Sequence, residues 1–214
     1  MELLGECYEI RVGKKEKDIY LPKNKPMLIK VPKAKYFCIQ GKGNPNQQDF
    51  QNRIGALYAL SYTIRMMPKN GYTPEGYYEY TVYPLEGFWD LSEVGRQKEE
   101  LDKNELIYTI MIKQPDFVDE KLFEQALTIA KQKKQNPLLD EVYFDRIDEG
   151  LCVQMMHIGS YDHEKETFDC MKEYIANNHM EIKTLVHKEI YISDIRKVSP
   201  EKLKTVLRYQ VVQQ

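Results

Sequence analysis

The predicted secondary structure repeats along the chain, and this duplication constrains the fold more than any other feature. An apolar run over residues 36–41 ends in glycine. It precedes residues 49–67, where apolar side chains recur every three to four positions, as on one face of a helix. Runs rich in β-forming residues come next, over residues 77–83 and 105–113. The first copy is therefore strand, helix, strand, strand.

The second copy has the same order of elements, although its sequence identity to the first is weak. A strand over residues 152–159 also ends in glycine, and the pattern over 162–178 predicts an amphipathic helix. Strands over residues 185–193 and 205–212 complete the copy. Three acidic side chains gather at the positively polarised start of the helix: Asp162, Glu164 and Glu166.

We therefore predict an α+β fold made of tandem duplicated strand-helix-strand-strand units, with antiparallel sheets and helices on one face. Two such units side by side would leave a central ligand cleft. Ahead of these elements, at the start of the second round, residues 119–134 form a predicted amphipathic helix. The turn signal at residues 148–150 predicts a hairpin between strands over 141–147 and 151–158.

Length and composition are those of an ordinary globular protein, because 214 residues with 42% hydrophobic and 30% charged residues can bury a sizeable core. Residues 1–34 are rich in lysine and proline and are predicted to be an extended lead-in with an edge strand at Met27–Val31. The domain itself is expected over residues 35–214, with repeat one at about 35–115 and repeat two at about 116–214.

Charge and residue usage exclude several classes of function. A formal net charge of −2 argues against a nucleic-acid partner, and no apolar run is long enough for a membrane span. The first residues lack the basic start of a secretory signal, so we expect a cytoplasmic protein. No spacing of histidine or cysteine predicts a metal site, and no motif predicts a cofactor. The sequence does not indicate an oligomeric state.

The cysteines agree with a reducing compartment. None of them forms a Cys-x-x-Cys pair, and Cys38 and Cys152 lie in apolar strand-like runs, which predicts buried, reduced thiols. The full set is Cys7, Cys38, Cys152 and Cys170.

The strand over residues 185–193 carries the first candidate site. Alternation along a strand places Val186 and Ile190 on one face, which we expect to contact the helices. His187, Glu189 and Tyr191 then point to the other face. A carboxylate in an apolar cleft would attract a cation or hold a raised pKa, whereas on a solvated sheet face this trio would have no special role.

Aromatic and methionine side chains form the second candidate group. Phe88 and Trp89 follow a tyrosine-rich run in a predicted loop, where they either stack on a ligand or plug the rim of the core. Met155 and His157 share one face of their strand. Methionine gives adaptable contacts to varied ligands, although core packing is an equally ordinary role for it.

Several motifs together resemble the GyrI-like small-molecule-binding family, in its stand-alone branch without a DNA-binding domain. They include Pro-Leu-Glu-Gly-Phe-Trp at residues 84–89, His-Ile-Gly-Ser-Tyr at 157–161 and His-Lys-Glu-Ile-Tyr-Ile-Ser-Asp at 187–194. The resemblance begins at about residue 15 and covers nearly the whole remaining chain. It implies the duplicated fold around a central cleft, as in the effector-binding domains of MerR-type and AraC-type regulators.

The resemblance also implies a function. Such domains bind bulky, flat, often cationic drugs against a buried glutamate, which maps to Glu189 here. The resemblance further implies that Tyr191 lines the cleft beside Glu189, together with Pro84, Phe88, Trp89, Tyr143, Met155 and His157. The strand pattern adds His187 as a ligand-binding candidate, and Tyr191 is also a candidate to assist Glu189 in catalysis.

Two alternatives remain open at this point. Some stand-alone members are implied to hydrolyse the cyclopropane ring of DNA-alkylating natural products, with the same glutamate as general base. A protein-binding role, like that of the gyrase inhibitor that names the family, is the other.

Overall fold

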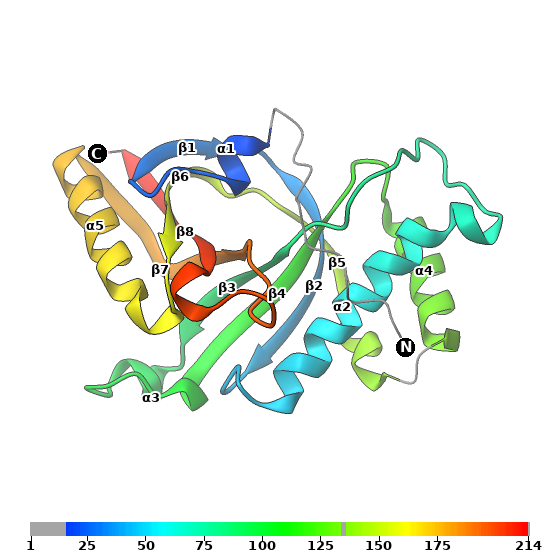
Figure 1. Cartoon of the computed structure of the whole chain (residues 1–214), viewed down its shortest axis with the longest axis horizontal. Helices are drawn as coiled ribbons and strands as arrows, with labels where there is room; N and C mark the ends of the chain where they lie inside the picture. Colours follow the sequence, from blue (N-terminus) through cyan, green and yellow to red (C-terminus); the bar gives the residue numbers. More distant parts are fainter. Residues whose placement is uncertain (1–15, 134–135, 214) are drawn as a thin grey trace. The chain divides into compact units, whose positions relative to one another are not determined.

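The chain forms two compact units and passes from one to the other twice, between Val31 and Pro32 and between Glu149 and Gly150. The computed structural model describes residues 16–133 and 136–213 (Figure 1). Unit 1 contains the described residues up to Val31 together with those from Gly150 onward, and unit 2 contains the described residues between them.

Unit 2 is a four-stranded antiparallel sheet in the order β3-β4-β2-β5. Its strands and main helices are β2 (Ala34–Lys42), α2 (Gln48–Met66), β3 (Leu85–Leu91), β4 (Leu106–Gln114), α4 (Glu120–Lys133) and β5 (Tyr143–Ile147). Short helical turns lie in the connections: η1 (Pro68–Asn70), α3 (Glu93–Arg96), η2 (Lys103–Glu105) and η3 (Pro137–Glu141).

Both long helices of unit 2 pack on the same sheet face. The Phe50 ring of α2 lies 5.7 Å from the Trp89 ring of β3, and Phe123 of α4 lies 5.3 Å from Phe37 of β2. The register aligns Phe37 with Ile112 and therefore places both on this face. The predicted helices over residues 49–67 and 119–134 are thus confirmed, because their apolar stripes cover this core.

Unit 1 is also a four-stranded antiparallel sheet, in the order β1-β6-β8-β7. Its elements are α1 (Lys17–Tyr20), β1 (Met27–Val31), β6 (Gly150–Ile158), η4 (Tyr161–His163), α5 (Glu164–Asn177), β7 (Met180–Tyr191), η5 (Pro200–Lys202) and β8 (Lys204–Gln213). Helix α5 buries Met171 and Ile175 against Val153 and Leu207 of the sheet.

The opposite face of the unit 1 sheet holds buried polar side chains. Arg208 is 2% exposed, and it donates from Nε to Oε1 of Gln154 at 3.0 Å and from Nη2 to the Ile19 carbonyl at 3.1 Å. The Gln154 amide in turn donates to the Asp18 carbonyl. These bonds anchor α1 to the sheet.

Strand order confirms the predicted duplication. In unit 2 the elements follow the chain as β2-α2-β3-β4, and the strands lie in the sheet in the order β3-β4-β2. In unit 1 the elements follow the chain as β6-α5-β7-β8, and the strands lie in the equivalent order β7-β8-β6. Each sheet gains a fourth strand from elsewhere in the chain, β5 in unit 2 and β1 in unit 1. Strand β1 is the predicted edge strand at Met27–Val31, and the part of the lead-in before residue 16 lies outside the described residues.

Two elements differ from the prediction. Residues 77–83 are not a strand; Tyr77, Tyr78 and Tyr80 instead cluster around the ring of Phe117. The second strand of the first copy is β3, in the segment predicted to be a loop.

The predicted hairpin around residues 148–150 is also wrong. Strand β5 pairs with β2, whereas β6 pairs with β1 and β8, because the chain passes from unit 2 to unit 1 at this turn. The helix and strand over residues 120–147 consequently belong to the unit that contains the first copy.

The described cysteines agree with the sequence analysis. Cys38 and Cys152 are buried and are not joined in a disulfide, while Cys7 lies outside the described residues. None of the helices in the described segments combines the length and the apolar character that a membrane crossing requires.

Candidate functional site

Strand β7 brings three predicted site residues together on one face. His187, Glu189 and Tyr191 alternate along the strand, and the register sets Glu189 opposite Leu207. Leu207 belongs to the core cluster under α5, so this face is the helix-covered one. Ile190, paired with Val206, lies on the face away from α5, so the prediction that it faces the helix is wrong.

The error has a simple cause. Both faces of β7 are shielded from solvent near its end, since Lys188 is 1% exposed and Ile190 is fully buried. Alternation of polar and apolar residues identifies the covered face only where the other face is solvated. Here a buried lysine occupies the face away from α5 and a buried carboxylate occupies the face toward it.

The Glu189 carboxylate is 9% exposed and accepts two hydrogen bonds from its own strand. Tyr191 donates its hydroxyl to Oε2 at 2.6 Å, and Nε2 of His187 lies 3.0 Å from Oε1. Neither a lysine nor an arginine pairs with this carboxylate within the described segments. A buried negative charge held only by polar neighbours is electrostatically incomplete, and it attracts a cation.

His187 is held in place by aromatic rings. Its imidazole lies 4.8 Å from the ring of Phe168 on α5 and 6.2 Å from the ring of Tyr209 on β8, both edge-on. These contacts fix the direction in which the imidazole meets Glu189.

Tyr161 and Glu164 complete the surroundings of Glu189, and the sequence analysis did not select either as a site residue. The Tyr161 ring meets the Tyr191 ring edge-on at 6.0 Å. Burial, with the charges of Glu189, Glu164 and Asp194, raises the pKa of Tyr161 to about 12. Burial followed by the charge of Glu189 also raises the pKa of Tyr191 well above its ordinary value.

Glu164 differs most from its predicted role. It was expected to lie with Asp162 and Glu166 at the positively polarised helix start, and the structure buries it there to 9% exposure. Burial first, then the charges of Glu189 and Asp162, raise the pKa of its carboxyl group to about 9. At neutral pH the Glu164 carboxyl is therefore neutral.

His157 has a structural role in this arrangement. Its Nδ1 lies 2.9 Å from the Thr167 hydroxyl on α5 and its Nε2 lies 3.0 Å from the Ser160 carbonyl. Nε2 donates to the carbonyl, since a carbonyl can only accept, and the Thr167 hydroxyl can either donate to Nδ1 or accept from it. Met155, paired in register with Leu207, packs against the α5 core.

The predicted aromatic residues of unit 2 divide between the two faces of their sheet. Trp89 is 5% exposed and packs under α2, between the rings of Phe50 and Tyr108. Phe88 and Tyr143 pack on the opposite face, against the cluster of Tyr36, Cys38 and Met111. Pro84 is buried just before β3. A ligand on one face of this sheet cannot contact both Phe88 and Trp89.

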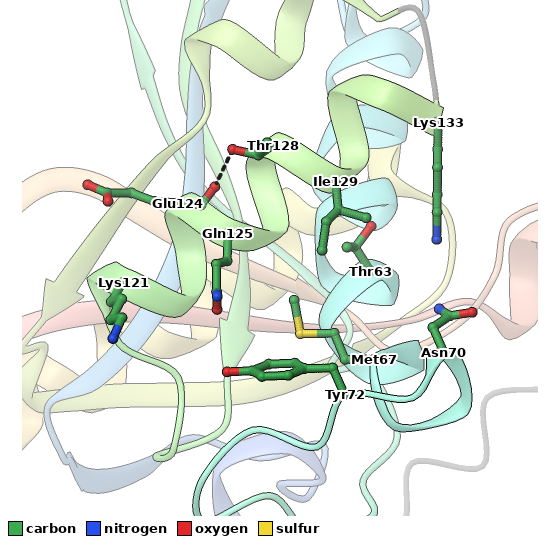
Figure 2. Close-up of a pocket in the computed structure, with 10 residues that line it drawn as sticks. All are labelled: Thr63, Met67, Asn70, Tyr72, Lys121, Glu124, Gln125, Thr128, Ile129 and Lys133. Atoms are coloured by element: carbon green, nitrogen blue, oxygen red, sulfur yellow. Dashed lines mark hydrogen bonds between the residues drawn. The ribbon is translucent and has the colours of Figure 1, made fainter.

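A pocket of about 490 Å³ lies in unit 2 between α2 and α4 (Figure 2). None of the predicted site residues lines it; its lining includes Met67, Tyr72 and Ile129 with lysines at its rim. The hydroxyl groups of Thr63 and Thr128 donate to carbonyls of their own helices, to Ala59 at 2.8 Å and to Glu124 at 3.0 Å. Lys121, Glu124 and Gln125 also line the pocket, so its wall is polar as well as apolar. The Glu189 cluster is the stronger candidate because its polar groups are buried.

The donor groups at the Glu189 cluster do not form a metal centre. Across residues 16–133 and 136–213, no three histidine, cysteine, aspartate or glutamate side chains are arranged to hold a metal ion. The cluster instead combines a buried carboxylate, a neutral carboxyl and tyrosine rings, which suits an organic cation or a reaction that needs a base.

A family model, the GyrI-like small molecule binding domain, matches residues 24–211. The chain belongs to the GyrI-like family. Among curated proteins, none matches the sequence. The family match agrees with the resemblance drawn from the motifs around Trp89 and Glu189.

Solved structures of similar proteins support the family and the fold. An uncharacterized conserved protein from Listeria innocua is 38% identical, with a TM-score of 0.87 over 93% of this chain and 98% of that one. A hydrolase from the same organism is 37% identical, with a TM-score of 0.85 over the same shares.

A more distant structure shares the fold alone. The C-terminal domain of EcmrR is 13% identical, with a TM-score of 0.52 over 89% of this chain and 98% of that domain. It confirms the α+β architecture of antiparallel sheets with helices.

Proposed function

We propose that this GyrI-like protein binds flat, hydrophobic cations at Glu189 and thereby sequesters toxic compounds. The observation that carries the proposal is the buried Glu189 carboxylate, which has tyrosine and histidine partners but neither a lysine nor an arginine partner within the described segments. A cationic ligand would supply the missing charge, and the edges and faces of Tyr161 and Tyr191 would contact its rings.

A fluorescence titration tests this proposal. Acridine orange, a planar fluorescent cation, is titrated into the wild type, Glu189→Gln and the control Glu181→Gln, which removes an exposed carboxylate from the same strand. A charge-assisted contact contributes about 1.5–3 kcal/mol, so Glu189→Gln is expected to bind at least about tenfold more weakly. Equal affinity of the wild type and Glu189→Gln would remove the electrostatic basis of the proposal.

Hydrolysis is the second candidate, and the 37% identity to a Listeria hydrolase over 93% of the chain favours it. In this proposal Glu189 takes a proton from a water molecule whose oxygen attacks a strained cyclopropane carbon. The ring C–C bond breaks, and its electron pair moves to the conjugated acceptor of the substrate. The acceptor then takes up the proton that Glu189 removed, so the product is the substrate plus one water. Tyr191 keeps the carboxylate oriented through its 2.6 Å hydrogen bond.

Mass spectrometry separates binding from hydrolysis. Incubation with a cyclopropane-containing alkylating compound should give a product heavier by one water. General-base catalysis typically contributes 10²–10⁴-fold, so Glu189→Gln should lose about that much rate. Formation of the water adduct at the same rate by Glu189→Gln would rule out this mechanism, while leaving binding intact.

A further inference from the structure

Two polar atoms near Glu189 are buried without a hydrogen-bond partner among the described residues: Oε1 of Glu164 and Oγ1 of Thr205. Glu164 is 9% exposed and Thr205 is 1% exposed, so bulk water does not serve as their partner. Most buried polar atoms in folded proteins have a partner, so each one that does not needs an explanation, such as a functional role or a bound molecule.

The sheet register places Thr205 in the site. Tyr191 of β7, Thr205 of β8 and His157 of β6 are paired across the three strands and therefore share the face under α5. These three residues form a row across the sheet. The hydrogen bond between His157 and Thr167 places the start of α5 over this row. Glu164 precedes Thr167 by three residues, about one helical turn, and so lies on the same side of the helix.

Nothing in the local fold requires a hydroxyl at position 205. A valine has the same shape, favours a strand equally well and would leave no unpaired polar atom. The next residue along β8 is in fact a fully buried valine, Val206. The hydroxyl at Thr205 is thus better explained by a bound molecule than by packing.

We propose that Glu164 and Thr205 are ligand-contacting residues of the Glu189 site, and that they select planar monocations carrying N–H donors on one edge. The Oε1 atom of Glu164 and the hydroxyl of Thr205 accept those hydrogen bonds, while Glu189 balances the single positive charge. This inference rests on the proposed cation-binding function. The raised pKa of Glu164 agrees with it, because a neutral second carboxyl leaves one net charge to be matched.

Two related dyes test the selection directly. Proflavine and acridine orange are both planar acridinium monocations, but only proflavine carries N–H donors on its exocyclic nitrogens. The ratio of their dissociation constants is measured by fluorescence titration for the wild type, Thr205→Val, Glu164→Leu and Glu164→Gln. Thr184→Val, a substitution in β7 outside the row, is the control.

The expected result is a loss of preference for proflavine. Removing one neutral hydrogen bond should change the ratio by about three- to tenfold in Thr205→Val and in Glu164→Leu. Glu164→Gln, which keeps a carbonyl oxygen, should retain most of the preference. The thermal midpoint of ligand-free Thr205→Val should equal or exceed that of the wild type, because an unpaired buried hydroxyl has been removed.

The outcomes separate this inference from the function on which it rests. If both dyes bind and the ratio is the same in the wild type, Thr205→Val and Glu164→Leu, the selection is overturned while cation binding stands. If Thr205→Val is destabilised and the ratio is unchanged, the hydroxyl has a purely structural role and the inference fails. If neither dye binds the wild type, both proposals fail.

Discussion

Replacing Glu164 with glutamine should make the folding stability of unit 1 less dependent on pH. The folded protein raises the pKa of this carboxyl from 4.5 to about 9, through burial first and then through the charges of Glu189 and Asp162. Between those two values the native state keeps a proton that the unfolded chain releases. The stabilisation of the native state by the neutral carboxyl is complete below the lower value and is lost progressively as the pH rises toward the higher one.

The size of the effect follows from proton linkage. One extra proton bound by the native state lowers the free energy of unfolding by about 1.4 kcal/mol for each pH unit gained. Between about pH 6 and pH 8, Glu164→Gln should therefore gain about 3 kcal/mol relative to the wild type. Other titrating groups contribute to both proteins alike and cancel in the difference.

Urea denaturation followed by far-ultraviolet circular dichroism measures this difference at about pH 6, 7 and 8. Glu166→Gln serves as the control, because it removes an exposed carboxyl from the same helix. It should follow the wild type at every pH. If the stability curves of Glu164→Gln and the wild type run parallel, Glu164 is not a neutral buried acid in the folded protein.

Three other substitutions test separate contacts. Tyr191→Phe removes the 2.6 Å hydrogen bond to Glu189 and should lower the free energy of unfolding by about 1–3 kcal/mol. The loss should be smaller in a Glu189→Gln background, and equal losses in both backgrounds would contradict the contact. Gly41→Ala would drive a methyl group into the Tyr108 ring and should destabilise the protein by about 1–3 kcal/mol in urea denaturation, a loss that Tyr108→Leu relieves. Arg208→Lys loses the guanidinium contacts to Gln154 and to the Ile19 carbonyl. Limited proteolysis should therefore cut near α1 faster than in the wild type, and an unchanged cleavage rate would refute the role of Arg208 in attaching α1 to the sheet.

Much of the fold could be predicted because its helices carry regular apolar stripes. The stripe over residues 49–67 became α2, whose buried positions include Phe50, Leu57 and Ile64. Strand β3 escaped prediction because Glu86 and Gly87 have low β-propensity. Gly87 is needed there because a methyl group would lie 2.8 Å from the Trp89 indole nitrogen. That requirement depends on the tertiary structure and leaves no local signal.

The candidate site was predictable only in part. The alternation in residues 187–191 correctly grouped His187, Glu189 and Tyr191, since a strand always brings such residues to one face. Glu164 and Thr205 come from α5 and β8, and only the packing of helix on sheet brings them near Glu189. An acidic residue is favourable in the first turn of any helix, so the local sequence carried no signal that Glu164 is buried.

The path of the chain has a consequence for biosynthesis. Strand β1 leaves the ribosome early, but its partner β6 begins only at Gly150, after the whole of unit 2 has been made. At typical synthesis rates of about 5–20 residues per second, β1 waits at least several seconds with its hydrogen-bonding edge unpaired. Unit 2 is continuous in sequence and can fold during that wait, so nascent chains are most exposed to aggregation through β1 until the C-terminal segment emerges.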